Sequence, residues 1–276
     1  MTENIRYKIG DVARILGIST DLIRYYEERG IVKPHKDKYN NYRYYDAWDV
    51  NFLVDCLWYK KMGFSIDAIA KMTSTESYDD FVRHLTDQGD EILASIQHQN
   101  LLLERIRNHT ESMVRVKDFL GVCDITRNKE FIFYLNRFNL EYNNSPELQL
   151  LNKAWEKYMP FTKRFFLISR DDIEKKGEDY AFGFSISIKY AEKFDIRAKP
   201  PVHRMKPKTC VHSAFKSFGK NKFTPQHLDF MLKFASKNRF RPAGPAFGNL
   251  IGSIPENGGH VGYFEAWIPV EEIEKK

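Results

Sequence analysis

The sequence has only three cysteines among its 276 residues: Cys56, Cys123 and Cys210. They are odd in number and far apart, which is not the pattern of a disulfide-stabilised secreted domain. Thiolate metal sensing requires several convergent sulfur or histidine ligands, and an iron–sulfur cluster requires four cysteines. We therefore expect no metal and no cofactor, and we interpret Cys123 as a buried free thiol.

Long apolar runs are also missing. No segment approaches the ~20 consecutive apolar residues of a membrane-spanning helix. Residues 1–12 lack the apolar core of a secretory signal peptide. We therefore expect no membrane contact and a cytoplasmic location, which the unpaired cysteines also favour.

Signatures of catalysis are missing as well. The sequence contains no Ser-His-Asp arrangement, no glycine-rich phosphate loop and no Walker-type motif. Four histidines have no ligand-like spacing and are interpreted as incidental: His203, His212, His227 and His260. We assign no catalytic residue and expect no enzyme.

The overall composition is 42% hydrophobic and 29% charged residues, with a net charge of +6, and it fits a globular protein of about two domains. The mild positive charge is compatible with a nucleic-acid partner but does not require one.

The pattern of residues 9–30 predicts two short helices joined by a tight turn. Gly17 ends the first helix, Ser19 is a typical N-cap for the second, and Gly30 ends that helix in turn. This is the layout of a helix-turn-helix, although small helical cores of this shape also occur in proteins that do not bind DNA.

A short β-hairpin is predicted next. Pro34 prevents a helix from continuing, and the residues around Arg43 have strand propensity. A helix-turn-helix followed by a hairpin is a winged helix. We expect Tyr44, Tyr45 and Trp48 to fasten this wing to the helical core. Two further helices are expected to begin after Asp46 and after Ser65, both typical caps.

A single long helix is predicted from about Tyr78 to Leu120, where there is no proline and one internal glycine. A seven-residue repeat runs through it and is best between Ile92 and Ile106. Its two tracks consist of Leu85, Ile92, Gln99, Ile106, Met113 and Leu120, and of Gly89, Ile96, Leu103, Thr110 and Lys117. Such a helix can belong to an intramolecular bundle or to a dimer. We favour the dimer, because a winged helix that reads DNA gains from twofold symmetry.

The remaining chain predicts a mixture of strands and helices, so the fold class is α+β. Phe182, Phe184, Ile186 and Ile188 alternate as on one face of a strand. Further strands are expected at residues 208–218, 245–254 and 261–270, with a helix at residues 224–238. No internal repeat is visible.

The N-terminal third resembles the MerR family of transcriptional regulators. The resemblance rests on YKIGDVARILGIS (7–19), IRYYEERGIVKP (23–34), NYRYYD (41–46) and KKMGFSIDAI (60–69), in that order. The C-terminal half resembles the GyrI-like effector-binding domain of the multidrug-sensing branch, on FGFSISIK (182–189) and GYFEAWIPV (262–270). The resemblance implies a winged helix-turn-helix in 1–75, a coiled-coil dimerisation helix in 76–121 and an effector domain in 122–276.

The resemblance also implies which residues contact DNA. Arg24 and Tyr25 would bind backbone phosphates, for which a forked guanidinium and a neutral hydroxyl are suited. Asp21 departs from the family, which often has a basic residue near this position. The resemblance therefore implies the mode of DNA binding but not the operator sequence. The full expected set is Ser19, Thr20, Asp21, Arg24, Tyr25, Tyr42, Arg43 and Lys60.

Glu265 is the central residue expected in the effector site. On a strand it shares one face with Tyr263 and Trp267, and a carboxylate between two rings suits a lipophilic cation. The alternative is a solvent-facing glutamate on an edge strand. Further walls are expected from Tyr180, Phe182, Phe184 and Trp155, although aromatic residues at strand spacing are also typical of a plain core.

Taken together, these features predict a ligand-responsive homodimeric activator. Its partners would be double-stranded promoter DNA, RNA polymerase and a small hydrophobic effector, cationic if the resemblance holds. Two alternatives remain open. One is a GyrI-like hydrolase that controls its own gene and uses Glu265 as a general base. The other is a regulator whose C-terminal domain binds a protein partner.

Overall fold

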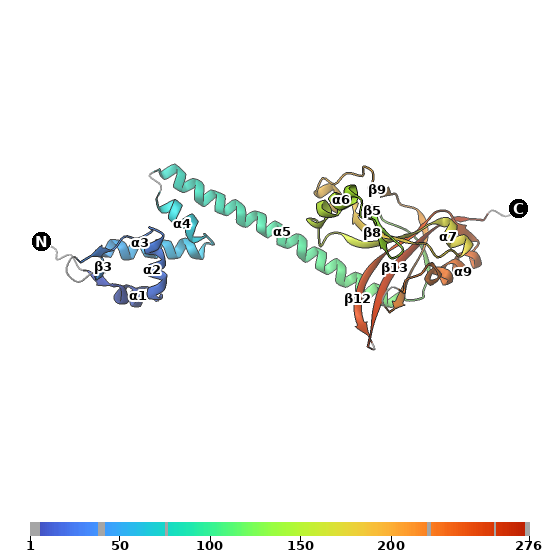
Figure 1. Cartoon of the computed structure of the whole chain (residues 1–276), viewed down its shortest axis with the longest axis horizontal. Coiled ribbons are helices and arrows are strands. Elements are labelled where there is room, and N and C mark those ends of the chain that lie inside the picture. Colours follow the sequence, from blue (N-terminus) through green and yellow to red (C-terminus); the bar gives the residue numbers. More distant parts are fainter. Residues whose placement is uncertain (1–5, 38–41, 75–76, 220–221, 257, 274–276) are drawn as a thin grey trace. The chain divides into compact units, whose positions relative to one another are not determined.

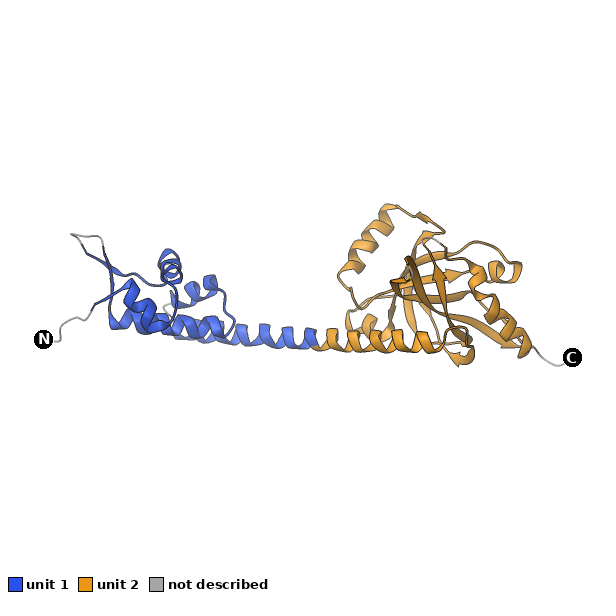
Figure 2. Ribbon diagram, turned by 90° about the horizontal axis from the view of Figure 1, so that it is seen from below, with its two compact units in different colours: residues 1–99 blue, residues 100–276 orange. Residues whose placement is uncertain are grey.

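The computed structural model describes residues 6–37, 42–74, 77–219, 222–256 and 258–273. The chain forms two compact units, unit 1 (Met1–Gln99) and unit 2 (Asn100–Lys276), shown in Figure 2. The boundary between them falls inside one long helix, α5 (Tyr78–Asp118). The expected boundary at residues 75 and 76 lies outside the described residues. None of the helices in the described ranges is both long and apolar enough to cross a membrane.

Unit 1 is a winged helix-turn-helix, as predicted (Figure 1). Its three short strands form one antiparallel sheet in the order β1-β3-β2. The elements before α5 are β1 (Tyr7–Lys8), α1 (Ile9–Leu16), α2 (Thr20–Glu28), β2 (His35–Lys36), β3 (Arg43–Tyr45), α3 (Ala47–Lys61) and α4 (Ile66–Thr73).

Local sequence signals account for the helix ends of unit 1. Gly17 ends α1 with φ at +66°, a conformation that glycine adopts without strain. The side chains of Ser19, Asp46 and Ser65 cap the helices α2, α3 and α4. The helices close over a core that includes Val12, Ile23, Tyr26, Tyr45, Leu53 and Ile69.

One residue of unit 1 that was expected to pack on the core, Trp48, is exposed instead. Tyr45 is fully buried and Tyr44 is half-buried, but the side chain of Trp48 is 78% exposed. Trp48 precedes the buried Val50 by two residues on α3, and two residues turn a helix by about 200°. The ring therefore faces away from the core, and the expectation that it fastens the wing was wrong.

The helix α5 exposes most of its predicted apolar seam. Leu85, Ile92, Ile96, Leu103 and Ile106 are each at least 36% exposed. The seam was predicted to continue to Leu120, but it does not. Met113 and Leu120 instead pack into unit 2, in a cluster with Val116, Ala214 and Ile251.

Unit 2 has the predicted α+β fold, built on one large antiparallel sheet. The order along its main path is β4-β10-β13-β12-β7-β8-β5-β6. Its strands are β4 (Asp124–Arg127), β5 (Phe131–Phe138), β6 (Glu141–Tyr142), β7 (Lys163–Ile168), β8 (Ala181–Ser187), β9 (His203–Met205), β10 (Thr209–Phe218), β11 (Phe240–Pro242), β12 (Ala246–Glu256) and β13 (Gly259–Glu272). Its helices are α6 (Pro146–Glu156), α7 (Arg170–Lys175), α8 (Ile188–Lys193), the 3-10 turn η1 (Pro225–Leu228) and α9 (Asp229–Lys237).

The sheet contains an internal repeat of topology. A strand, a helix and two strands occur first as β5-α6-β7-β8, with α7 in the last connection, and again as β10-α9-β12-β13. The strands pair in the order β7-β8-β5 in the first half and β12-β13-β10 in the second. The two halves join where β7 pairs with β12. The sequence shows no repeat, because only the strand order is shared.

The two faces of this sheet differ in what covers them. Helices α6, α7, α8 and α9 contribute to the apolar clusters on one face, which we call the helix face. The last turns of α5 pack on the opposite face, which we call the α5 face. Successive residues of a strand alternate between these faces, so the face decides which cavity a side chain can line.

Two smaller expectations for unit 2 need correction. Ile188 was expected to extend the alternating strand, but Ser187 has the backbone conformation of an N-cap and Ile188 begins α8. Cys123 was expected to be buried. It is a free thiol, but it is only half-buried, since it follows the exposed Val122 and touches the core from one side.

Candidate DNA interface and effector cavities

The second helix of the helix-turn-helix, α2, presents a short charged surface. Ser19 accepts a hydrogen bond from the backbone of Leu22 and so caps α2, and Thr20 follows it as the first helical residue. Asp21 lies one turn before Arg24, and their side chains form an exposed ion pair of 2.9 Å. An exposed pair of this kind is weak, so Arg24 can exchange Asp21 for a phosphate.

Arg43 ties the wing to α2. Its Nε donates to Glu27 Oε2 at 2.7 Å, and the hydroxyl of Tyr45 donates to the other carboxylate oxygen of Glu27. Burial of the Tyr45 ring raises the pKa of its hydroxyl, and the bond and charge of Glu27 raise it further. Glu27 therefore holds both ends of β3. The side chain of Arg43 remains 41% exposed, and its Nε alone is engaged by Glu27, which leaves the outer guanidinium nitrogens available to a ligand.

A hollow of about 500 Å³ lies between the start of α1 and the wing. Its lining includes three cationic side chains, Lys8, Arg24 and Arg43. The ammonium of Lys8 lies 5.8 Å from the centre of the Tyr42 ring. Sequence analysis missed Lys8. Its signal was a basic residue next to the N-terminus of the first helix, a position that also attracts anions.

The other five expected DNA contacts do not line this hollow, and among them Tyr25 and Lys60 have surroundings of their own. The ring of Tyr25 is half-buried and packs 5.0 Å from the guanidinium carbon of Arg29, which also pairs with Asp67. Lys60 is exposed in the last turn of α3. The structure thus gathers Arg24, Tyr42 and Arg43 but not Lys60.

In unit 2 the structure does not bring the expected effector residues into one box. Glu265 and Trp267 line a cavity of about 380 Å³ on the α5 face, which we call the Glu265 cavity. Tyr180, Phe182 and Phe184 line a different cavity, on the helix face. Trp155 is buried in α6, edge-on to Tyr134. Tyr263 packs beneath α5, and its hydroxyl donates to Glu256 at 3.1 Å.

Glu265 lies at the centre of the sheet and not on an edge strand. Its strand, β13, pairs with β10 on one side and with β12 on the other. Glu265 is 5% exposed. Its Oε1 accepts a hydrogen bond from His212 Nε2 at 3.0 Å, and Arg115 Nε of α5 lies 3.6 Å from the same oxygen.

His212 bridges two carboxylates. Its Nδ1 lies 2.9 Å from Asp124 Oδ1, and its ring stacks on Trp267 with 5.0 Å between the centroids. Burial opposes protonation of the imidazole, but the hydrogen bonds and charges of Glu265 and Asp124 outweigh burial, so the pKa of His212 lies above its ordinary value. His212 is therefore not incidental. No spacing in the sequence pointed to it, because its partners lie on other strands.

The walls of the Glu265 cavity carry a small excess of positive charge. Four cationic side chains, Arg115, Arg127, Lys129 and Lys163, face three carboxylates, Asp124, Glu130 and Glu265. Glu130 is engaged by Arg204 at 2.6 Å. Burial and the neighbouring cations Arg105, Arg115 and Lys129 lower the pKa of Lys163, and Glu265 only partly offsets them. The described part of the chain shows no group of His, Cys, Asp and Glu side chains arranged to hold a metal ion.

Comparison with known sequences identifies the N-terminal unit. Residues 7–76 match the family described as MerR HTH family regulatory protein. The HTH-type transcriptional regulator CueR of Escherichia coli O6:H1 is 31% identical over 103 residues, which are 36% of this chain and 75% of CueR. The HTH-type transcriptional activator TipA of Streptomyces coelicolor is 27% identical over 90 residues, which are 33% of this chain and 35% of TipA.

Similarity to solved structures is low. EcmrR, in the cryo-EM structure of the EcmrR–DNA complex in EcmrR–RPo, is 15% identical, with 97% of this chain and 100% of that chain covered and a TM-score of 0.38. The N-terminal part of the Bacillus subtilis multidrug transporter activator is 24% identical, with 37% and 95% covered and a TM-score of 0.35. The assignment therefore rests on the sequence matches and on the winged helix-turn-helix of unit 1. The chain belongs to the MerR family of helix-turn-helix regulatory proteins.

Proposed function

We propose that this protein is a one-component transcriptional activator that binds promoter DNA as a homodimer and responds to a small hydrophobic effector. The winged helix-turn-helix of residues 1–75 contacts DNA, the helix within residues 76–121 forms the dimer, and residues 122–276 form a GyrI-like effector domain. RNA polymerase is the further partner that the family resemblance implies.

The ion pair between Arg115 and Glu265 carries this proposal. Arg115 belongs to α5, the helix that runs into both units, and Glu265 belongs to the cavity wall. The pair is long, at 3.6 Å, and Arg115 is half exposed, so a ligand can replace it at modest cost. An effector that donates to Glu265 releases Arg115, and this gives the ligand a different affinity for two states of α5.

Displacement of Arg115 from Glu265 also restricts the chemical groups that an effector can carry. Glu265 accepts a cation or a neutral donor, while the aromatic walls Phe119, Phe247 and Trp267 contact an apolar body. A cationic effector binds against the repulsion of Lys129 and Lys163 and must take the place of Arg115. The expected cationic effector thus depends on displacement of Arg115, because Glu265 is not free.

Unit 1 and α5 supply the DNA-binding and dimeric parts of the proposal. The exposed apolar seam of α5 is long enough to pair with a second copy. Lys8, Arg24 and Arg43 concentrate positive charge beside the wing, where phosphates would lie. A dimer places two such surfaces on a near-palindromic site, and a change in α5 then alters how the pair bends and twists the duplex.

A thermal-shift screen of lipophilic cations tests the effector step on three forms of the full chain: wild type, Glu265→Gln and Arg115→Ala. We expect a shift for the wild type, a smaller shift for Glu265→Gln, and a larger one for Arg115→Ala, in which the competitor is gone. Arg115→Ala should also lose ligand-dependent transcription in vitro while it keeps DNA binding. No shift in any form would overturn the effector proposal.

A hydrolase is the second candidate, and one observation favours it. Asp124, His212 and Glu265 form a continuous carboxylate–imidazole–carboxylate chain in a cavity, an arrangement that can move protons. Mass spectrometry of the same incubations checks for products. Product that disappears in Glu265→Gln would favour the enzyme, whereas unchanged ligand supports the regulator.

A further inference from the structure

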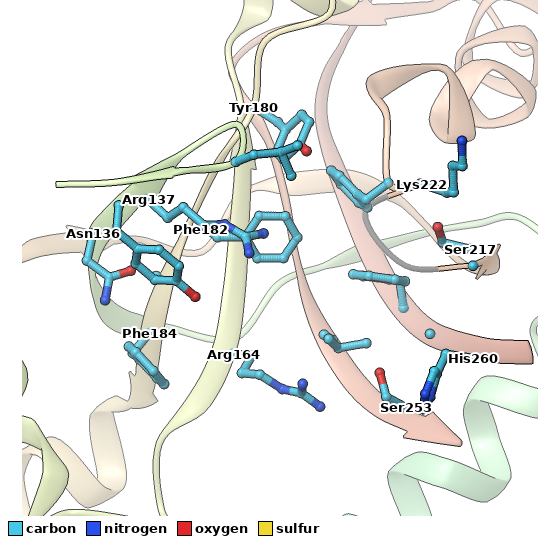
Figure 3. Close-up of a pocket in the computed structure, with 18 residues that line it drawn as sticks. Asn136, Arg137, Arg164, Tyr180, Phe182, Phe184, Ser217, Lys222, Ser253 and His260 are labelled. Carbon is cyan, nitrogen blue, oxygen red and sulfur yellow. The ribbon is translucent and has the colours of Figure 1, made fainter. Parts of the chain in front are cut away.

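A second cavity, on the helix face of unit 2, has the charge of an anion site. It measures about 490 Å³ and is lined by the aromatic residues Tyr142, Tyr180, Phe182, Phe184, Phe223 and Phe264 (Figure 3). Arg137, Arg164 and Lys222 also line it, with His260. None of the described residues on its wall is an aspartate or a glutamate. We call it the arginine cavity.

Arg137 is held in place without a carboxylate. Its guanidinium carbon lies 4.3 Å from the centre of the Phe182 ring and 5.7 Å from that of Tyr142. Its Nε is buried and has no hydrogen-bond partner within the described residues. Aromatic faces fix the plane of the guanidinium but cannot satisfy its N–H groups, so a buried donor remains unpaired at a cost in stability.

Arg164 is the second unneutralised cation. It reaches into the cavity from β7, as Figure 3 shows, and the described chain offers it neither an ion pair nor a side-chain hydrogen bond. Burial lowers its pKa, since the protein walls remove part of its hydration. Arg137 is half-buried and Arg164 is exposed at the cavity wall, and neither has a carboxylate partner among the described residues, so both guanidinium groups are available to an anion.

The same positive field extends to a neighbouring hollow of about 400 Å³, which shares Arg164, Phe184 and Leu250 with the arginine cavity. There, burial lowers the pKa of His109, and the charges of Arg105, Lys163 and Arg164 lower it further. Because Arg105 and His109 belong to α5, an anion bound at Arg164 also interacts with that helix.

We propose that the arginine cavity binds a planar aromatic carboxylate, whose ring lies among the aromatic walls and whose carboxylate is held by Arg137 and Arg164. Guanidinium groups bind carboxylates through two parallel hydrogen bonds, and an apolar wall desolvates those bonds and strengthens them. The cavity volume suits a ligand of two or three rings. This site is distinct from the Glu265 cavity, because it lies on the opposite face of the sheet.

The chain offers a matched control for this site. Lys163 and Arg164 are adjacent cations on β7 that point to opposite faces of the sheet. Both line the neighbouring hollow, but only Arg164 lines the arginine cavity and only Lys163 lines the Glu265 cavity. Arg164→Gln therefore removes a charge from the arginine cavity, and Lys163→Gln removes one from the Glu265 cavity. Arg137→Gln is a second variant of the site. Its loss of charge breaks no ion pair that the described residues show.

Isothermal titration of the full-length protein with 2-naphthoate, and with the neutral 2-naphthamide, tests the proposal. We expect 2-naphthoate to bind, and to lose about tenfold or more in affinity in Arg137→Gln and in Arg164→Gln. Lys163→Gln should bind like the wild type, and 2-naphthamide should bind at least tenfold more weakly than the acid.

Three results would overturn the proposal: no binding of 2-naphthoate at millimolar concentration, equal affinity for the amide, or an equal loss in Lys163→Gln and Arg164→Gln. Hydrogen exchange of the wild type with 2-naphthoate locates the site even if a variant fails to fold. Protection is expected in residues 134–142 and 180–184, and protection confined to residues 124–130 would instead place the ligand in the Glu265 cavity. None of these results depends on DNA binding, so they are independent of the proposed regulator.

Discussion

The two units hold their charged candidate residues in opposite ways. In unit 1 the Asp21 and Arg24 side chains form their ion pair while 85% and 54% exposed. In unit 2 the Glu265 and His212 side chains interact while only 6% and 8% exposed. Exposed pairs contribute about 0–1 kcal/mol, whereas breaking a buried pair costs about 3–5 kcal/mol. Substitutions in unit 1 should therefore change binding first, and substitutions in the Glu265 cavity should change stability first.

Glu265→Ala should give the largest effect. It leaves His212 without its buried acceptor and removes the partner of Arg115, so we expect unit 2 to lose about 3 kcal/mol of stability. Hydrogen exchange of peptides from β10 and β13 measures this loss locally. Asp21→Ala is the exposed control and should change the exchange of unit 1 by less than about 0.5 kcal/mol. Equal effects of the two substitutions would remove the contrast between the units.

Glu27 is the exception within unit 1 and should give the next largest effect. Its side chain is only 11% exposed and accepts from both Arg43 and the buried Tyr45. Glu27→Ala leaves the Tyr45 hydroxyl unpaired, at a cost of about 1–3 kcal/mol to unit 1. Adding Tyr45→Phe to this variant should recover part of the loss in chemical denaturation. If the double variant is no more stable than Glu27→Ala, the hydroxyl is satisfied in another way.

The same contrast explains what could be predicted from the sequence. The elements of unit 1 follow from local signals, such as the caps at Ser19, Asp46 and Ser65 and the left-handed Gly17, because each acts within one helical turn. Alternation likewise predicted the strand β8, and strands were also expected where β10, β12 and β13 lie. Ile188 and Trp48 were misplaced where a strand or helix begins and the periodicity changes.

The effector cavities could not be predicted in the same way. Glu265 is on β13, its partner His212 is on β10 and Arg115 is on α5, so their proximity depends on strand order. Alternation correctly places Glu265 and Trp267 on one face, but it cannot say that Phe182 and Phe184 lie on the other face of the same sheet. The order in which the strands pair decides which face each side chain lies on, and this order cannot be read from a single sequence without a visible repeat.

The stability of unit 2 should depend on pH through His212, which has no counterpart among the candidate residues of unit 1. The pKa of His212 is raised in the folded protein, so its contribution to stability is fully present below its unfolded pKa of about 6.5 and is lost as pH rises through the higher folded value. Urea unfolding of unit 2 should therefore show declining stability on the alkaline side of about pH 6.5. His212→Gln should lose this pH dependence. An unchanged dependence in the variant would assign it to another group.

In unit 1, substitution of Arg43 should change DNA binding and should have the smallest effect on stability of the substitutions considered. Its Nε is committed to Glu27, so only the outer guanidinium nitrogens can reach a phosphate. Arg43→Ala should weaken binding to many DNA sequences alike and lower the salt slope by about one unit. Lys60→Ala, at an exposed position in the last turn of α3, should lower the slope by a similar amount without affecting the wing.

The Arg43→Lys variant distinguishes the two roles of Arg43, because a single ammonium cannot bind Glu27 and a phosphate at the same time as a guanidinium fork does. Its salt slope should therefore fall nearly as far as that of Arg43→Ala in a salt-titrated binding assay, and an unchanged slope for both variants would remove Arg43 from the DNA interface.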